Sequence, residues 1–246
     1  MHLSILTGAS RGLGLALAAQ LLARGHRVLA LSRRAPELIV PPGADLLHWA
    51  VDLADAAPVA QRLGVWLAQQ GPAEVESATL INNAGVVSKL APLSDVASDD
   101  LINALRVGLE APTLLTAAFL RATASWEIPR KVVLVSSGLG RRAMAGSGSY
   151  CAAKAGLDHL ARAVALEEAA KPHGARIVSL APGVIDTDMQ VQLRASDAAL
   201  FPDRARFVEM KESGQLDSPA TAATKLLRYL DRADFGSQPV GDVRDA

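Results

Sequence analysis

Thr7-Gly8-Ala9-Ser10-Arg11-Gly12-Leu13-Gly14 is the stretch that decides how this chain folds. It follows a β-rich run, Leu3 to Thr7, and it opens a segment, Gly12 to Arg24, in which leucines recur at helical spacing as far as Gly25. Glycines in such a turn let backbone N–H groups approach a pyrophosphate, and the helix N-terminus adds partial positive charge. The order of strand, glycine-rich turn and helix therefore predicts a dinucleotide site.

The same alternation continues along the chain. Further β-rich runs lie at Arg27 to Leu31, Leu46 to Val51, Thr79 to Asn82, Lys131 to Ser136 and Arg176 to Leu180. Strands that alternate with helices predict a parallel sheet covered on both faces. We therefore expect an α/β fold: one Rossmann-like, doubly wound parallel sheet of about seven strands, forming a single domain over residues 1–246.

Three other segments complete the expected outline. Helical patterns cover Ser98 to Leu120, with a kink expected at Pro112, and Ser149 to Ala170. From Asp186 to Asp217 the sequence loses periodicity and mixes charges with scattered apolar residues. A long irregular segment in a sheet enzyme is often a movable cover, so residues 186–217 are predicted to form a flap over the substrate.

Composition excludes several classes of protein. Among the 246 residues, Lys plus Arg number 25 and Asp plus Glu number 25, so no basic excess is present to bind nucleic acid or an anionic membrane. The single cysteine excludes an intrachain disulfide. Charged residues or prolines interrupt every apolar stretch, no targeting peptide is recognisable, and the five scattered histidines give no metal-site spacing. We expect a cytoplasmic protein without a metal.

The end of the second predicted strand indicates which dinucleotide is used. An acid that would hold the ribose 2′-hydroxyl of NAD is expected there, but the sequence reads Leu31-Ser32-Arg33-Arg34. Together with Arg11 in the glycine turn, these arginines offer guanidinium groups to a 2′-phosphate. The pattern favours NADP(H). An alternative stays open, in which the arginines only face water and NAD is the cofactor.

A tyrosine, a lysine and a serine carry the predicted chemistry. Tyr150 and Lys154 are four residues apart on a predicted helix, about 40° around its axis, so they share one face. Ser137 follows a strand, at the carboxyl edge of the sheet where ligands of open α/β folds bind. A phenol can protonate the alkoxide formed when hydride reduces a carbonyl, provided that a nearby cation brings its pKa of about 10 toward neutrality.

Two further motifs point to a known family. Asn82-Asn83-Ala84-Gly85 follows the fourth predicted strand, and Pro182-Gly183 follows the sixth. With the glycine turn and the serine, tyrosine and lysine, they resemble the short-chain dehydrogenase/reductase family from Leu3 to about Met189, and within it the relatives of sepiapterin and benzil reductases.

The resemblance implies roles for particular residues. Catalysis would fall to Ser137, Tyr150 and Lys154. The cofactor would be bound by Gly8, Ser10, Arg11, Gly12, Leu13, Gly14, Ser32, Arg33, Asp52, Asn83, Ala84, Gly85, Tyr150, Lys154, Pro182, Gly183 and Thr187. The family's habit also implies a homodimer or homotetramer.

One position departs from the family. Gly108 stands where the family places an asparagine that supports a proton relay, and Asn103, five residues earlier, points about 140° away around a helix. The leading interpretation is an NADPH-dependent reductase of a small, partly apolar carbonyl compound. Two alternatives remain: an NAD-dependent alcohol dehydrogenase, and a nucleotide-binding sensor or scaffold of the same fold with little or no turnover.

Overall fold

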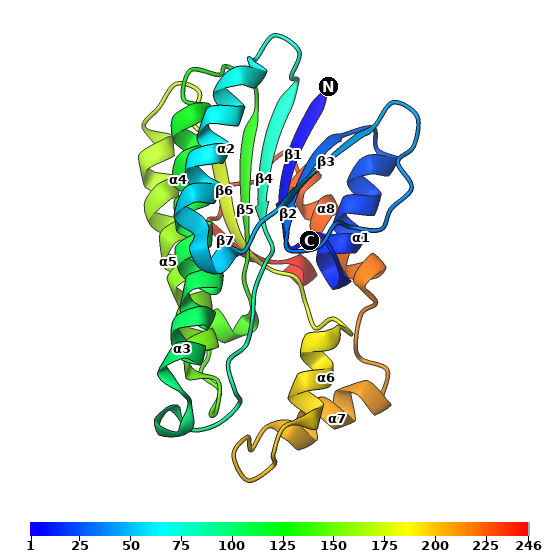
Figure 1. Ribbon diagram of the computed structural model, residues 1–246, viewed down its shortest axis with the longest axis vertical. Coiled ribbons are helices and arrows are strands. Elements are labelled where there is room, and N and C mark those ends of the chain that lie inside the picture. Colours follow the sequence, from blue (N-terminus) through cyan, green and yellow to red (C-terminus); the bar gives the residue numbers. More distant parts are fainter. Residues whose placement is uncertain (246) are drawn as a thin grey trace.

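A seven-stranded parallel sheet forms the centre of the molecule in the computed structural model, which describes residues 1–245 (Figure 1). The strands lie in the order β3-β2-β1-β4-β5-β6-β7. Their bounds are His2–Thr7, Arg27–Ser32, Asp45–Ala50, Ser77–Asn82, Arg130–Val135, Arg176–Ala181 and Val240–Asp242, for β1 to β7. The first six confirm the predicted strands to within two residues at either end. The seventh is only three residues long and had no recognisable signal.

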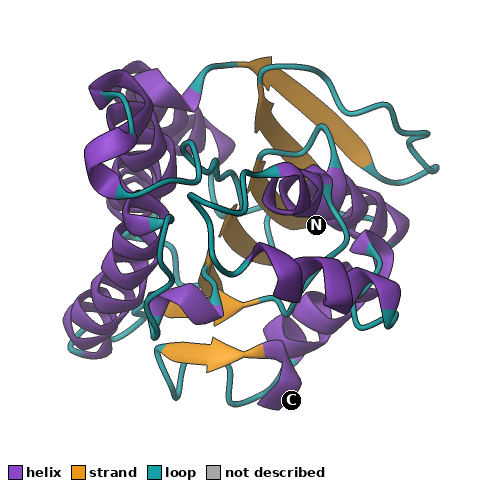
Figure 2. Cartoon of the chain, turned by 90° about the horizontal axis from the view of Figure 1, so that it is seen from below, coloured by secondary structure: helices purple, strands orange, loops and turns teal. Residues whose placement is uncertain are grey.

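Helices cover both faces of the sheet, which confirms the predicted doubly wound fold (Figures 1 and 2). One face is covered by α1 and α8, and the other by α2, α4 and α5. The helices α1 to α8 span Gly12–Ala23, Ala56–Gln70, Ser98–Leu105, Ala111–Ala122, Gly148–Ala169, Asp188–Ala195, Arg204–Glu212 and Pro219–Asp231. The inner strands are almost wholly buried because both of their faces meet helices.

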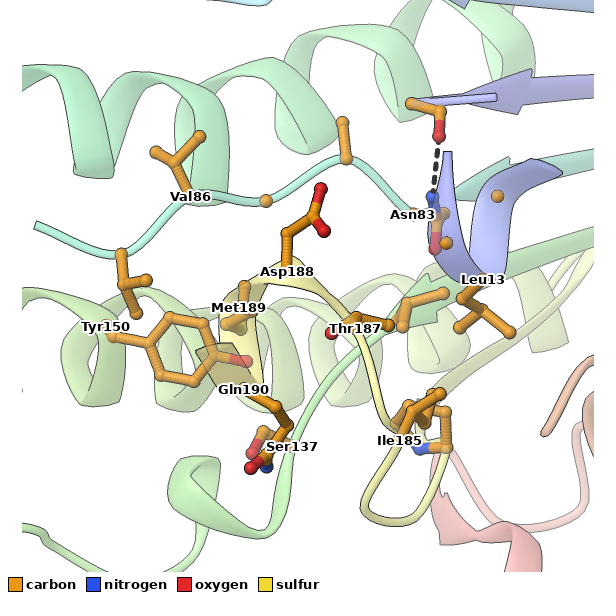
Figure 3. Close-up of a pocket in the computed structure, with 18 of the residues that line it drawn as sticks. Leu13, Asn83, Val86, Ser137, Tyr150, Ile185, Thr187, Asp188, Met189 and Gln190 are labelled. Atoms are coloured by element: carbon orange, nitrogen blue, oxygen red, sulfur yellow. Dashed lines mark hydrogen bonds between the residues drawn. The ribbon is translucent and has the colours of Figure 1, made fainter. Parts of the chain in front are cut away.

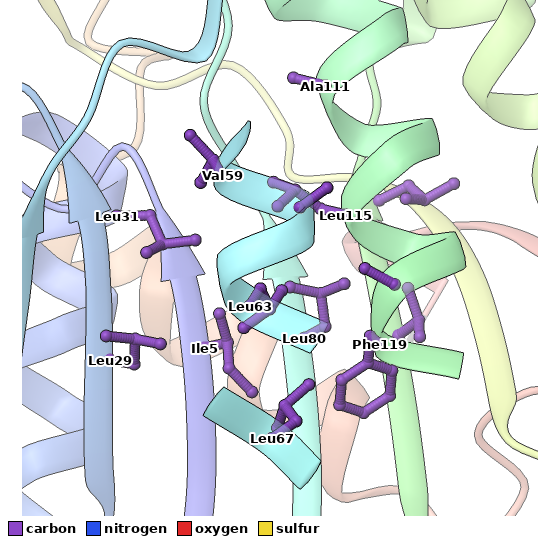
Figure 4. Close-up of a cluster of buried hydrophobic side chains, with 14 of the residues drawn as sticks. Ile5, Leu29, Leu31, Val59, Leu63, Leu67, Leu80, Ala111, Leu115 and Phe119 are labelled. Carbon is purple, nitrogen blue, oxygen red and sulfur yellow. The ribbon is translucent and has the colours of Figure 1, made fainter. Parts of the chain in front are cut away.

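Each helical layer packs on the sheet through its own apolar cluster. Figure 4 shows the larger cluster, in which Ile5 and Leu80 of the sheet meet Leu63 of α2 and Phe119 of α4. These four side chains have no exposed surface. Burial of a side chain of this size stabilises a fold by about 1.5–3 kcal/mol. The sheet is therefore a rigid support for the residues at its carboxyl edge.

The helix expected over residues 98–120 is interrupted in the turn directly before Pro112. Helix α3 ends at Leu105, a π-helical turn (η3) spans Arg106–Glu110, and α4 begins at Ala111. Pro112 lies in the first turn of α4, where the missing N–H matters least. The break therefore comes from the wider turn, which places Gly108 against α5.

The segment expected to be irregular contains two helices instead. Helices α6 and α7 form an arm, here called the α6–α7 arm and defined as residues 186–217, which lies below the sheet in Figure 1. Phe201 and Phe207 stack in it with ring centroids 5.7 Å apart, and they pack with Leu193 against Leu90 and Met144. The two helices are only eight and nine residues long, too short to give a clear helical period.

Within residues 1–245, every helix is too short or too polar to cross a bilayer. The same residues bring no three His, Cys, Asp or Glu side chains into an arrangement that could hold a metal ion.

Candidate active site

One cavity of about 1210 Å³ opens at the carboxyl edge of the sheet. It runs from the glycine-rich turn after β1 to the α6–α7 arm, and Figure 3 shows part of its wall. Every residue that the sequence predicts for catalysis or cofactor binding lines this cavity. They meet because the carboxyl ends of parallel strands lie on the same side of a sheet.

The turn after β1 is a cradle that only glycines permit. Gly8 and Gly12 have φ values of +69° and +54°, in the left-handed region that side chains disfavour. A Cβ on Gly14 would overlap the carbonyl oxygen of Gly8, and a Cβ on Gly12 would lie 3.3 Å from Cγ2 of Thr187. The backbone therefore stays open at the start of α1, as a bound pyrophosphate requires. These residues fit a dinucleotide.

Asn83 ties this turn to the neighbouring strand. Its amide nitrogen Nδ2 donates to the carbonyl oxygen of Thr7 at 3.0 Å, while the hydroxyl of Thr7 accepts from the backbone N–H groups of Asn83 and Ala84 at 2.9 Å each. The turn and the end of β4 are thus one hydrogen-bonded unit. Asn83 therefore stabilises the conformation of the turn, independently of any ligand.

The arginines predicted to meet a 2′-phosphate differ in their surroundings. Arg33 is exposed at the cavity edge, and its turn is held by the hydroxyl of Ser32, which donates to the carbonyl of Arg34 at 2.7 Å. Arg11 instead pairs with Asp188 of α6 at 2.9 Å, with both side chains about two-thirds exposed. An ion pair so exposed contributes little stability, so it can exchange partners readily.

Asp52 also faces the cavity while serving the fold. It precedes the short 3₁₀ helix η1 (Leu53–Asp55), and its carboxylate accepts from the N–H of Ala54 at 2.9 Å. This cap fixes the carboxylate beside the cleft.

Tyr150 and Lys154 extend from α5 beside Ser137. Lys154 is buried, and its ammonium Nζ donates to the carbonyl of Val135 at 2.7 Å. The same Nζ lies 5.4 Å from the centroid of the Tyr150 ring. Ser137 begins the 3₁₀ helix η4 (Gly138–Gly140), where its oxygen accepts from the N–H of Leu139 at 3.2 Å. All three residues line the cavity, and Figure 3 shows Tyr150 and Ser137 in its wall.

The pKa values differ from the simple expectation. Burial raises the pKa of the Tyr150 phenol to about 12, although its hydrogen bond with Ser137 opposes this. Burial also lowers the pKa of Lys154 to about 8, while the Asp158 carboxylate acts to raise it. The expectation that a cation brings the phenol pKa toward neutrality is therefore not met by the residues of the chain alone. The phenol keeps its proton at neutral pH, when most Lys154 side chains are charged.

Asp158 is a residue that the sequence analysis missed. It lies one turn after Lys154 on α5, is 2% exposed, and accepts from the hydroxyls of Ser136 and Ser179 at 2.7 and 2.6 Å. Its second oxygen lies 3.2 Å from the guanidinium Nε of Arg141. The four-residue repeat of Tyr150, Lys154 and Asp158 was the available signal. The hydroxyl of Ser136 is occupied by this carboxylate, whereas Ser137 faces the tyrosine.

Gly108 lies where α3 and η3 meet α5. A Cβ built on Gly108 would stand 3.1 Å from Cβ of Ala153, the residue before Lys154. This is closer than most Cβ contacts, so the missing side chain allows the tight approach of the two helices. Asn103, which helical spacing placed on a different face from Gly108, also lines the cavity.

The far end of the cavity is mostly apolar. Its wall includes Leu139, Met144, Met189, Leu193 and Phe207. Among them stands Gln190, a buried amide on α6, and Arg142 and Arg206 add positive charge at the rim.

Comparison with known proteins agrees with this geometry. The family described as short chain dehydrogenase matches residues 3–198. The chain belongs to the short-chain dehydrogenase family. The resemblance inferred from its motifs is thus confirmed, and with it the assignment to an oxidoreductase family.

Individual members of the short-chain dehydrogenase family resemble the chain over nearly its whole length. A benzil reductase ((S)-benzoin forming) of Bacillus cereus is 34% identical over 247 residues, 99% of this chain and 98% of the relative. A sepiapterin reductase of Rattus norvegicus is 34% identical over 258 residues, 98% of this chain and 95% of the relative. The solved structure of a putative 2-deoxy-D-gluconate 3-dehydrogenase of Agrobacterium tumefaciens, with bound NADP, superposes with a TM-score of 0.79 at 28% identity and covers 98% and 94% of the two chains.

Proposed function

We propose that this short-chain dehydrogenase acts as one domain, residues 1–246, and uses NADPH to reduce a carbonyl group of a small, partly apolar compound to an alcohol. The observation that carries the proposal is the single cavity that joins the glycine cradle and Arg33 to Tyr150, Ser137 and Lys154. The relatives named for reductase activity and the Agrobacterium neighbour with bound NADP support it.

The cofactor would lie along the carboxyl edge of the sheet. Gly8, Gly12 and Gly14 would hold the pyrophosphate, and Arg33 would meet the 2′-phosphate with Arg11 exchanging its partner Asp188. Asp52 and the segment from Asn83 to Gly85 would contact the adenosine half. Pro182, Gly183 and Thr187 would contact the nicotinamide half. When bound, NADPH supplies the hydride.

Ser137, Tyr150 and Lys154 act together to bind and protonate the carbonyl oxygen of the substrate. Ser137 and Tyr150 donate hydrogen bonds to the carbonyl oxygen, which orients it and stabilises the negative charge that develops there. Tyr150 then transfers its phenolic proton to that oxygen, so that the alkoxide becomes an alcohol and the phenol becomes a phenolate. The Lys154 ammonium, fixed by its bond to the Val135 carbonyl, stabilises the phenolate.

The far wall indicates the substrate class. Its apolar side chains favour a substrate with an aromatic or aliphatic part. The open side of the cavity leaves room for polar groups of the substrate. Aromatic ketones and diketones, with benzil among them, are the first compounds to test, because two relatives are named as benzil reductases.

The decisive experiment follows NADPH and NADH oxidation with benzil and a panel of carbonyl compounds. Tyr150→Phe removes the proton donor and is expected to lower kcat by about 10²–10⁴-fold. Its Kd for NADPH should change less than about threefold. Turnover that prefers NADH would identify an alcohol dehydrogenase of the other cofactor class. Tight NADPH binding without oxidation across the panel would identify a sensor or scaffold.

We also propose that the enzyme is a cytoplasmic homodimer or homotetramer, on the support of the family's habit. Sedimentation velocity on the purified chain distinguishes these two assemblies from a monomer. Fractionation of cells that express the chain tests the compartment.

A further inference from the structure

The inner side of helix α6 carries one amide among apolar side chains. Met189 and Leu193 on this side pack into the cluster of the α6–α7 arm, and Gln190 lies between them in sequence, 5% exposed. Both Gln190 and its neighbours line the cavity. A buried amide in such a place needs polar partners, because desolvation without a hydrogen bond is unfavourable.

Only half of this amide is matched by the protein. Nη1 of Arg194, one turn further along α6, donates to the amide oxygen of Gln190 at 3.4 Å. Arg194 is itself oriented by the carboxylate of Asp186 at 3.6 Å. Within residues 1–245, no group accepts a hydrogen bond from the amide nitrogen of Gln190. With the oxygen directed to a guanidinium, the two N–H donors are left for a ligand.

The position of α6 places this donor beside the reacting groups. Thr187, directly before the helix, lies next to Gly12 of the cofactor turn, so α6 begins over the cofactor site. In Figure 3, Gln190 extends from α6 toward the part of the wall that holds Ser137 and the hydroxyl of Tyr150. The cavity thus contains the Gln190 amide as a donor in addition to Ser137 and Tyr150.

We propose that the amide nitrogen of Gln190 binds a second substrate oxygen, on the carbon next to the reacting carbonyl. This inference rests on the proposed function and deepens it. Ser137 and Tyr150 bind the oxygen that is reduced, and Gln190 binds its neighbour. The structure thereby favours 1,2-dicarbonyl compounds and α-oxygenated ketones over simple ketones of the same shape, because only the former offer an acceptor to this donor.

Two substrates that differ by one oxygen test this role. These are 1-phenyl-1,2-propanedione and 1-phenyl-1-propanone, each assayed with NADPH against wild type and Gln190→Met. Methionine keeps the length of the side chain but has no donor. The variant should lose about tenfold in kcat/KM for the diketone and less than twofold for the monoketone. The greater intrinsic reactivity of the diketone cancels, because each substrate is compared between two enzymes.

A matched control lies on helix α2, outside the cavity. Gln61 is exposed and does not line the cavity, so Gln61→Met makes the same chemical change and should leave the ratio of the two kcat/KM values unchanged. The Kd for NADPH and the thermal midpoint of Gln190→Met show whether the site stays intact. Equal losses for both ketones, or no loss, would overturn the role of Gln190 and leave the proposed function standing. Failure of wild type to oxidise NADPH with either ketone would overturn both.

Discussion

The two ends of the cavity recognise ligands by different means. At the glycine-rich end, the surface is made of backbone: Gly8, Gly12 and Gly14 keep it open, and Asn83 binds it to β4 through the main chain of Thr7. At the α6–α7 arm, the surface is made of side chains, among them Met189, Gln190 and Phe207. A binding surface made of backbone tolerates few amino-acid substitutions. A binding surface made of side chains changes its shape and polarity with each substitution. The first end fits a cofactor shared by a family, and the second fits a particular substrate.

The two ends also differ in how they join the sheet. The glycine-rich turn continues directly from β1 into α1, both of which pack in the large clusters. The arm has a separate cluster and reaches the turn through the exposed pair of Arg11 and Asp188. We therefore expect the arm to open locally at a lower free energy than the sheet.

The largest effect on ligand binding is expected from Gly14→Ala, which disrupts the backbone surface at the glycine-rich end. Its Cβ would overlap the Gly8 carbonyl, so the turn must shift and NADPH affinity should fall by more than about 100-fold, or about 2.8 kcal/mol. Fluorescence titration with NADPH measures it.

The matched control for this change is Gly64→Ala in the middle of α2, where a Cβ meets no atom within 4 Å. It should leave binding unchanged and stabilise the fold by about 0.5–1 kcal/mol. Similar affinities for the two variants would refute a backbone cradle.

A smaller loss is expected from Arg33→Ala at the same end. Removal of a guanidinium from a 2′-phosphate should weaken NADPH binding by about 10- to 30-fold, while NADH binding changes little. Arg34→Ala is the control, since Arg34 does not line the cavity. Equal weakening of both dinucleotides would show that Arg33 acts on the fold rather than on the phosphate.

Asp158→Asn tests the charge beneath the catalytic pair. Asparagine can still accept from Ser136 and Ser179, but it no longer raises the pKa of Lys154. The activity needs charged Lys154, so it is present at low pH and lost as pH rises through the Lys154 pKa, which is about 8.

Without the carboxylate, that alkaline limb should move to lower pH by about one unit, which lowers kcat about fivefold at pH 8. A pH profile of kcat from pH 5.5 to 9.5 measures the shift. Asp99→Asn, an exposed change on α3, should leave the limb in place. A profile of Asp158→Asn that falls by the same factor at every pH would mean a structural role only.

The smallest effect on global stability is expected from Phe207→Ala in the arm. Because Phe207 packs in the separate cluster, its loss should raise KM about threefold and lower Tm by less than about 4 °C. Phe119→Ala removes the same side chain from the large cluster and should lower Tm by about 10 °C. Calorimetry compares the two variants. Equal Tm losses would show that arm and sheet unfold together.

The sequence was sufficient for the sheet and for its carboxyl edge. Buried parallel strands have strong apolar runs, and the topology then gathers residues as distant as Gly8, Ser137 and Thr187 around one cavity. The arm was missed because its two helices are short and bury their apolar residues against each other. Pro112 indicated an interruption of this helix, but the π-helical form of the turn before it could not be inferred from the sequence. The raised pKa of Tyr150 depends on burial, which spacing alone does not reveal.

The π turn at Arg106–Glu110 makes one continuous helix serve two neighbours. Before it, α3 packs against α5; after it, α4 packs against α2. A π-helical turn holds one residue more than an α-helical turn, so the side chains on either side of it keep their directions. A deletion of one residue in this turn would therefore restore the ordinary helical pitch and leave Leu115 and Phe119 on the sheet. The wider turn thus keeps in phase the half of the helix beside the catalytic residues and the half that holds the core.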